Sequence, residues 1–370
     1  MKALIFSDLH CHQHKNSQSR LEDCIEVLEW VFKTAKSKNI DLIIFCGDLF
    51  HDRAKIDIMT YQRVFEVFQK YVDIIDGPEV YLLLGNHDLF FFESKEISSV
   101  YPLSSIKNIK IISKPSVVDI RQYKVGFMPY THDPITDLEN IKIREFKKNL
   151  EINPNNKYKT LFGHIAVHGA LFNLVYGTKS DVQIEGDAGM VVVTPDIFDN
   201  FDRIFLGHYH AAQELNHKVE YVGSPLQLSF GEMGQSKHII VYDFDTDTRE
   251  YIVNDFSHKH HRFNSIKEAK VSAVKGELNG EFVEVYDENT SSTEALELKQ
   301  LFIDKKLSTF SIKQLPKSKD LEVIDIKNAK SILSSSKQML TNYIGSIKDL
   351  KLDGKILLNI GEKICEKKVN

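Results

Sequence analysis

The chain alternates short apolar runs with longer stretches in which apolar residues recur every three or four positions. Short runs rich in Ile, Val, Leu and Phe have the length of buried strands, and the longer spacing is typical of helices that pack one face on a sheet. We predict helices over residues 20–37 and 59–73. We predict strands at 3–6, 42–46, 80–84, 125–128, 160–162, 204–206 and 239–242. The strand–helix–strand–helix–strand order at the start indicates an α/β layered domain.

The pattern changes after about residue 256. A strand over 282–286, a short helix over 292–302 and a strand over 309–314 predict a small β-α-β unit. Residues 328–347 place their apolar positions on one helical face, which either packs on its own domain or binds a partner, and a shorter helix is expected over 356–364. The expected domains are 1–257, 258–326 and 327–370.

Composition limits the class of protein. Apolar residues make up 42% and charged residues 27% of the 370 positions, which is typical of soluble globular proteins. Because no run of about 18 uncharged apolar residues and no signal-like start occurs, we expect no membrane span and a cytoplasmic location, the host cytoplasm if a phage encodes the chain. The four cysteines form no C-x-x-C pair, so neither a disulfide framework nor a thiolate zinc site is expected.

Charge alone argues weakly against a nucleic-acid binder, because the net charge is −5. The charge is uneven, however. Residues 256–370 hold 20 Lys and Arg against 16 Asp and Glu, so the C-terminal third is mildly basic while the rest is acidic. Some of the Asp and Glu residues in the acidic part of the chain are expected to bind metal ions.

Polar clusters follow five of the predicted strands. In open α/β sheets ligand sites gather at the carboxyl ends of strands, so these clusters are expected to face one site. Their carboxylate, amide and imidazole groups suit Mn²⁺, Fe²⁺ or Zn²⁺. Two ions that share one carboxylate would use all seven ligands, a known device for phosphate-ester hydrolysis. The candidate ligands are Asp8, His10, Asp48, Asn86, His164, His208 and His210.

The spacing within the pairs has a physical basis. In Asp-x-His and His-x-His the two side chains point the same way, because the side-chain period of an extended chain is two. Each residue alone also has an ordinary explanation, since an Asp after a strand can cap a helix and a loop His is usually solvated. The prediction of a metal site therefore depends on the whole set.

Five motifs carry a family resemblance. Ser-Asp-Leu-His at 7–10, Gly-Asp-Leu-Phe-His at 47–51, Gly-Asn-His-Asp at 85–88, Gly-His at 163–164 and Gly-His-Tyr-His at 207–210 resemble, in order and spacing, the motif series of the calcineurin-like metallophosphoesterases. His51 and the segment 221–232, followed by Gly234 and Ser236-Lys237, resemble the SbcD branch, the nuclease subunit of a double-strand-break repair complex. This resemblance implies a four-layer α/β β-sandwich flanked by helices, with a small α+β capping domain and C-terminal helices.

The resemblance also implies roles for individual residues. Asp8, His10, Asp48 and His210 would hold one metal, and Asp48, Asn86, His164 and His208 the other, with Asp48 as the bridge. His87 would be the catalytic histidine and Asp88 would orient its ring, while His51 would lie near the scissile phosphate. For His51 and Asp88 a catalytic and a supporting role both stay open. His164 is preferred to His168 because its Gly-His junction follows a strand.

The function implied is that of a manganese-dependent DNA nuclease, with 3'-5' exonuclease and single-strand endonuclease activity. Two divalent ions are expected, Mn²⁺ before Mg²⁺, Fe²⁺ or Zn²⁺. The expected partners are DNA, held at its phosphates by the capping domain, and SbcC, an SMC-like ATPase that would bind residues 328–347. Relatives form homodimers, and the apolar stripe at 59–73 is either such a surface or part of the core.

Two alternatives to a nuclease stay open. One is a phosphatase or cyclic-nucleotide phosphodiesterase of the same superfamily, although a small ester needs no duplex-sized cap. The other is a scaffold that anchors an ATPase to DNA and has lost catalysis, although every ligand position is intact.

Overall fold

The computed structural model describes residues 1–13, 18–74, 77–91, 94–141, 160–173, 178–179, 191–199, 201–287 and 291–314. The chain divides into two compact units, Met1–Gln314 and Leu315–Asn370. The second unit lies outside the described residues, and so do the helices predicted over 328–347 and 356–364. The domain boundaries after 257 and 326 stay predictions.

Two six-stranded sheets form the centre of the first unit. In the first sheet four parallel strands are followed on one side by two antiparallel ones, in the order β16 (Thr248–Asn254), β15 (Lys237–Asp243), β1 (Lys2–Phe6), β2 (Leu42–Phe45), β3 (Glu79–Leu83) and β6 (Ile109–Ile112). In the second sheet four parallel strands lie between two antiparallel edges, in the order β13 (Gln213–Glu214), β14 (Val219–Tyr221), β12 (Arg203–Gly207), β9 (Thr160–His164), β8 (Tyr123–Met128) and β7 (Ser116–Ile120).

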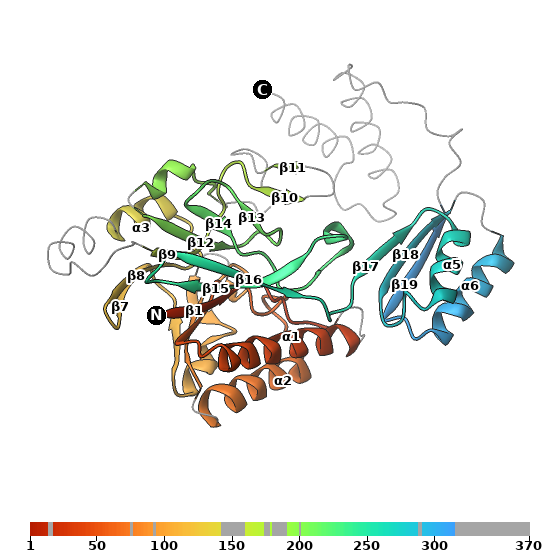
Figure 1. The fold of residues 1–370 in the computed structure, drawn as a ribbon, viewed down its shortest axis with the longest axis horizontal. Coiled ribbons are helices and arrows are strands. Elements are labelled where there is room, and N and C mark those ends of the chain that lie inside the picture. Colours follow the sequence, from red (N-terminus) through yellow and green to blue (C-terminus); the bar gives the residue numbers. More distant parts are fainter. Residues whose placement is uncertain are drawn as a thin grey trace, which may run out of the picture. The chain divides into compact units, whose positions relative to one another are not determined.

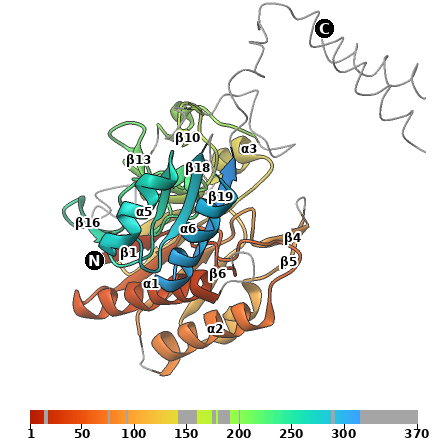
Figure 2. The ribbon, with the colours of Figure 1, turned by 90° about the vertical axis from the view of Figure 1, so that its right-hand side faces the viewer.

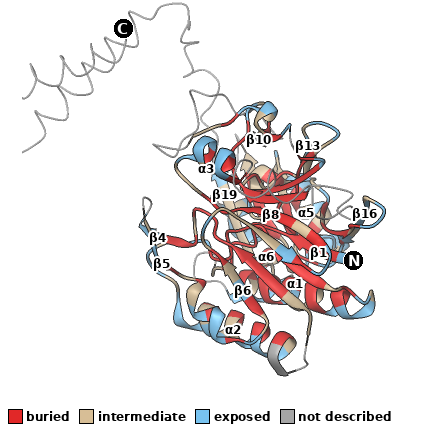
Figure 3. Cartoon of the chain, turned by 90° about the vertical axis from the view of Figure 1, so that its left-hand side faces the viewer, coloured by how far each residue is buried: buried red, intermediate tan, exposed pale blue. Residues whose placement is uncertain are grey.

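The sheets and helices stack in layers, and side-chain alternation explains how. In β1, Ala3 and Ile5 face the second sheet and pack with Phe127 of β8, whereas Leu4 and Phe6 face the helices. The helices α1 (Gln18–Ser37) and α2 (Ile58–Phe68) lie side by side against that outer face (Figure 1). Figure 3 shows β1 and β8 almost wholly buried and α2 exposed along its outer side. The predicted layered sandwich is confirmed.

The outer face of the second sheet packs against shorter elements. Residues Leu161, Ile204 and Leu206 meet Leu138 and Ile141 of α3 (Pro134–Ile141). The remaining short elements are η1 (Gln69–Ile74), β4 (Leu89–Phe91), β5 (Ser94–Ser98), η2 (Tyr101–Ser105), β10 (Leu171–Asn173), β11 (Thr178–Lys179), η4 (Pro195–Phe198) and η5 (Phe230–Glu232).

A separate three-stranded parallel sheet follows in sequence. Its strands β17 (His260–Phe263), β18 (Phe282–Asp287) and β19 (Thr309–Gln314) are connected by α5 (Ile266–Lys275) and α6 (Ser292–Asp304). Both helices lie on one face of this sheet (Figures 1 and 2) and share a core with Val283 and Val285. The predicted strands and helix of this region are confirmed, while β17 and α5 were not foreseen.

The apolar stripe at 59–73 lies on α2 and η1. Val64, Phe68 and Val72 are buried in the main core, and Tyr61 and Phe65 pack against it. Within the described ranges the stripe therefore packs inside the monomer, while Ile58 and Met59 are exposed. In the same ranges, none of the helices is both long and apolar enough to span a bilayer.

Candidate metal centre

Both large sheets direct their parallel carboxyl ends to one place. Asp8 and His10 follow β1, Asp48 follows β2 and Asn86 follows β3. From the second sheet, His164 ends β9, and His208 and His210 follow β12. The two sheets are joined at this point, because the backbone N–H of His208 donates to Asp8 Oδ2 at 3.0 Å. All seven predicted ligands come from this meeting of strand ends.

The turns that carry these side chains are strained. Asp8, His10, Asp48 and His208 have φ of 52°, 47°, 63° and 100°, in the left-handed region that non-glycine residues rarely adopt. The loops after β1 and β2 are held together by backbone hydrogen bonds from Asp8 N to Gly47 O at 2.9 Å and from His10 N to Asp48 O at 3.1 Å. Such strain persists only where the surrounding structure enforces it, and it concentrates at functional sites.

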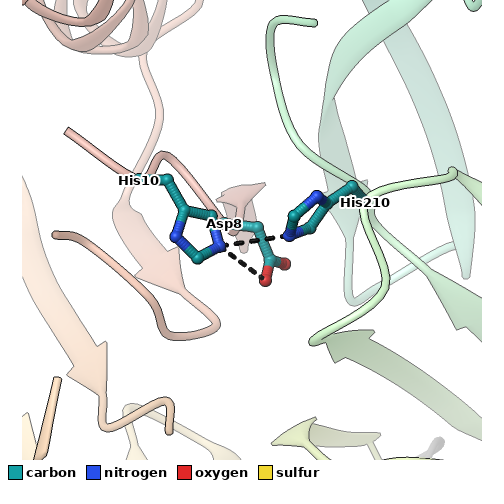
Figure 4. Close-up of side chains that lie close together, drawn as sticks. All are labelled: Asp8, His10 and His210. Carbon is teal, nitrogen blue, oxygen red and sulfur yellow. Dashed lines mark hydrogen bonds and ion pairs between the residues drawn. The ribbon is translucent and has the colours of Figure 1, made fainter. Parts of the chain in front are cut away.

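Asp8, His10 and His210 form the first half of the site (Figure 4). The Nε2 atoms of His10 and His210 are 3.1 Å apart, and His10 Nε2 lies 3.9 Å from Asp8 Oδ1 and 3.5 Å from Asp48 Oδ2. Two imidazole nitrogens at this distance can share only one proton. A divalent cation between them would accept both lone pairs and balance the carboxylates, so the donor set fits a metal ion.

Asp48, Asn86, His164 and His208 form the second half. His164 Nδ1 lies 2.7 Å from the carbonyl oxygen of Cys46, so Nδ1 donates to that oxygen and Nε2 faces the site. That Nε2 atom lies 3.0 Å from Asn86 Oδ1 and 3.4 Å from Asp48 Oδ2. The Nδ1 atom of His208 lies 3.2 Å from the same Asn86 oxygen. Asp48 is thus adjacent to both halves.

Electrostatics support the same interpretation. Burial alone would raise the pKa of Asp48, but His164 and His10 hold it well below its ordinary value. Burial opposes protonation of His164, yet Asp48 and Asp8 raise its pKa to about 9. Burial, followed by the charge of His164, lowers the pKa of His208 to about 3. Asp48 therefore attracts positive charge strongly, which a divalent cation would supply.

The three predicted catalytic residues lie at the same site but make different contacts. An imidazole nitrogen of His87 lies within 4.8 Å of ligand atoms of His10 and Asp48. Its Nδ1 lies 2.6 Å from the backbone oxygen of His51, and the His51 and His87 rings are roughly parallel with centroids 5.9 Å apart. The backbone carbonyl of His51 therefore holds the His87 ring.

Asp88 binds backbone groups of two ligand loops. Its two oxygens accept backbone N–H groups from Gly85, Asp48 and Leu49 at 2.8–2.9 Å. Burial, followed by the charge of Asp48, raises the pKa of Asp88 to about 7. Asp88 therefore joins the loops after β2 and β3, and the ring orientation that the resemblance implies stays a prediction.

Two further points concern the choice of ligands. His168 is exposed, while His164 is fully buried in the cluster, which agrees with the choice of His164. Sequence reasoning assigned no individual role to Glu232, whose Oε1 lies 2.9 Å from His210 Nδ1. Glu232 belongs to the 221–232 segment that resembles SbcD, but a contact across 22 positions leaves no local signal.

Two sheets that end in a buried cluster of carboxylate, amide and imidazole groups are typical of a hydrolase that uses divalent metal ions. The chain belongs to the calcineurin-like phosphoesterase family, which it matches over residues 1–212.

Several known proteins are similar to this chain. The chain is 24% identical over 263 residues to Exonuclease subunit 1 of Enterobacteria phage T4, covering 69% of this chain and 68% of that protein. It is 26% identical over 284 residues to the SbcD subunit of the nuclease SbcCD from Escherichia coli K12, again covering 69% and 68%. Among solved structures, TT1561 of Thermus thermophilus aligns with a TM-score of 0.36 at 13% identity, covering 68% of this chain and 98% of that one.

Proposed function

We propose that this protein is a DNA nuclease that hydrolyses phosphodiester bonds with two divalent metal ions, and that Mn²⁺ is the preferred ion. The observation that carries the proposal is the placement of Asp48, whose carboxylate lies 3.5 Å from His10 Nε2 and 3.4 Å from His164 Nε2. One carboxylate between two ligand sets is the arrangement that a two-metal site needs. The resemblance of the motifs to SbcD and the names of the relatives support DNA as the substrate.

The ligand assignment follows the geometry. Asp8, His10 and His210 would hold one ion, Asn86, His164 and His208 the other, and Asp48 both. When bound, the ions supply positive charge that polarises the phosphate ester and stabilises its transition state. Nδ1 of His87 donates to the His51 carbonyl, so the other nitrogen is left to contact the leaving oxygen, and the imidazolium form of the ring would give that oxygen its Nε2 proton.

His51 and Asp88 support this arrangement. His51 is exposed beside His87 and can contact the substrate phosphate with its ring while its carbonyl fixes His87. Asp88 fixes the backbone on both sides of the site, including the N–H of Asp48 itself. We assign His51 to substrate positioning and Asp88 to the rigidity of the ligand loops.

The partners follow from the same proposal. The unit of β17–β19, α5 and α6 would act as the cap that holds DNA phosphates, residues 328–347 would bind an SbcC-like ATPase, and 3'-5' exonuclease and single-strand endonuclease activities are expected. Homodimerisation stays a prediction.

A comparison of substrates tests the proposal. Mn²⁺-dependent turnover is measured on end-labelled duplex DNA, on single-stranded DNA and on bis(p-nitrophenyl) phosphate. We expect cleavage of both DNA substrates and its loss in His87→Asn. Turnover of the small ester alone would show a phosphatase or small-molecule phosphodiesterase. Removal of residues 328–370 should spare cleavage and abolish binding to the ATPase.

A further inference from the structure

The loop after β12 leaves the His210 ring partly exposed, so something other than core packing must fix it. About a third of the side chain is exposed, and the hydrogen-bonding neighbours of its two nitrogens are His10 at Nε2 and Glu232 at Nδ1. His10 gives little support, because its own Nδ1 is buried with no hydrogen-bond partner. The orientation of His210 therefore depends on Glu232.

Glu232 is itself held rigidly. It is only 6% exposed, at the end of η5. Its Oε2 lies 2.7 Å from Lys237 Nζ and accepts from Leu228 N at 3.0 Å and from Ser224 Oγ at 3.2 Å. With Oε2 occupied by three donors, Oε1 is left for His210.

Lys237 connects this carboxylate to the backbone that carries His210. Its Nζ donates to the carbonyl oxygen of His210 at 2.9 Å and to Ser224 Oγ at 2.9 Å, and the residue is only 4% exposed. Glu232 and Lys237 thus hold His210 at both ring and main chain. A buried ion pair with so many satisfied contacts specifies one geometry, since a small rotation of either side chain breaks several hydrogen bonds.

We propose that Glu232 is a positioning residue for His210, an inference that rests on the proposed metal centre. Glu232 fixes the proton of the His210 ring on Nδ1. It thereby points the Nε2 atom of His210 at the position that Asp8 and His10 also face. A carboxylate behind a ligating histidine sets its tautomer and makes its other nitrogen a better donor to a metal. His164 has only the neutral Cys46 carbonyl in the corresponding place. The two halves of the site therefore differ in what supports their imidazoles.

The test measures metal affinity in the full-length chain. Mn²⁺ is titrated and the free ion is followed by its electron paramagnetic resonance signal, with a two-site fit. The double variant Glu232→Leu/Lys237→Met, called the Leu variant, removes both charges, so that no buried ion is left unpaired. The double variant Glu232→Gln/Lys237→Met, called the Gln variant, has nearly the native shape and keeps an acceptor for His210 Nδ1. The matched control is Glu220→Leu/Arg249→Met, which removes the 2.6 Å ion pair between the buried Glu220 of β14 and the partly exposed Arg249 of β16.

We expect the Leu variant to weaken one of the two Mn²⁺ sites by about 10–100-fold, the Gln variant to weaken the same site less, and the control to bind like the wild type. The proposal is overturned if a folded Leu variant, with the melting temperature of the control, binds Mn²⁺ with wild-type affinity. Equal losses in the Leu and Gln variants would also contradict it.

His210→Ala separates this inference from the metal centre itself. It should weaken the same site at least as much as the Leu variant. If His210→Ala leaves both affinities unchanged, the proposed centre is wrong. If it weakens one site while the Glu232 variants do not, the centre stands and the role of Glu232 is wrong.

Discussion

Gly85 offers a direct test of how tightly the ligand loops pack. A Cβ atom at Gly85 would lie 2.1 Å from Asp48 Oδ1 and 2.5 Å from Asp48 N. Contacts under 3.0 Å do not occur for real Cβ atoms, so Gly85→Ala must move the Asp48 carboxylate by about 1 Å. A displacement of that size in a catalytic group costs roughly 10²-fold in rate.

The assay compares Gly85→Ala with a substitution of the same size elsewhere in the core. In Gly126→Ala the new Cβ would meet Leu161 Cδ1 at 2.9 Å, away from every candidate ligand. Overpacking should cost Gly85→Ala about 1–3 kcal/mol of unfolding free energy and Gly126→Ala less, because Leu161 Cδ1 is the end of a flexible side chain. Only Gly85→Ala should also lose about 10²-fold in kcat/KM on bis(p-nitrophenyl) phosphate and weaken Mn²⁺ binding. Wild-type kinetics and affinity in folded Gly85→Ala would refute the placement of Asp48.

Three further predictions concern the site and its surroundings. His87→Asn should lower kcat by about 10²–10⁴-fold and leave Mn²⁺ affinity unchanged; a parallel loss of metal would make His87 a ligand. Mn²⁺ at about 100 times its Kd should stabilise the fold by about 2.7 kcal/mol per site, seen as a higher Tm that EDTA reverses. The hydrogen bond from His258 to Asp23 raises the pKa of His258, and the charges of Glu281 and Glu26 raise it as well, whereas burial lowers it. Its stabilisation should be complete below about pH 6.5 and lost as the pH rises through the raised pKa, so Asp23→Asn should reduce the difference in Tm between about pH 6 and about pH 8.5.

The helices and the buried strands of the main unit were predictable where the spacing of apolar residues was regular. Helix 20–37 corresponds to α1, and helix 59–73 corresponds to α2 with η1, because each buries one regular face. Edge strands such as β7 and β16 were missed. β7 reads Ser-Val-Val-Asp-Ile and β16 reads Thr-Arg-Glu-Tyr-Ile-Val-Asn, so polar residues interrupt both strands and neither has the long continuous apolar run that marks a strand buried on both sides.

The candidate site was predictable because its residues come in short local motifs at strand ends. The contacts that organise those residues were not, since they join distant positions. Asp88 accepts N–H groups from residues about 40 positions away, and Glu232 reaches back 22 positions to His210. The sequence shows that each of these carboxylates is present. Which backbone or side-chain groups it binds depends on how the two sheets pack, and the sequence alone does not show that.

The proposed chemistry depends above all on Asp48 binding two ions at once. Diffraction from crystals grown with Mn²⁺, recorded at the manganese absorption edge, locates the ions without reference to activity. We expect two anomalous peaks on either side of the Asp48 carboxylate, one beside His10 and His210 and the other beside His164 and His208, with both peaks diminished in Asp48→Asn. A single peak, or two peaks of which only one contacts Asp48, would rule out the shared carboxylate.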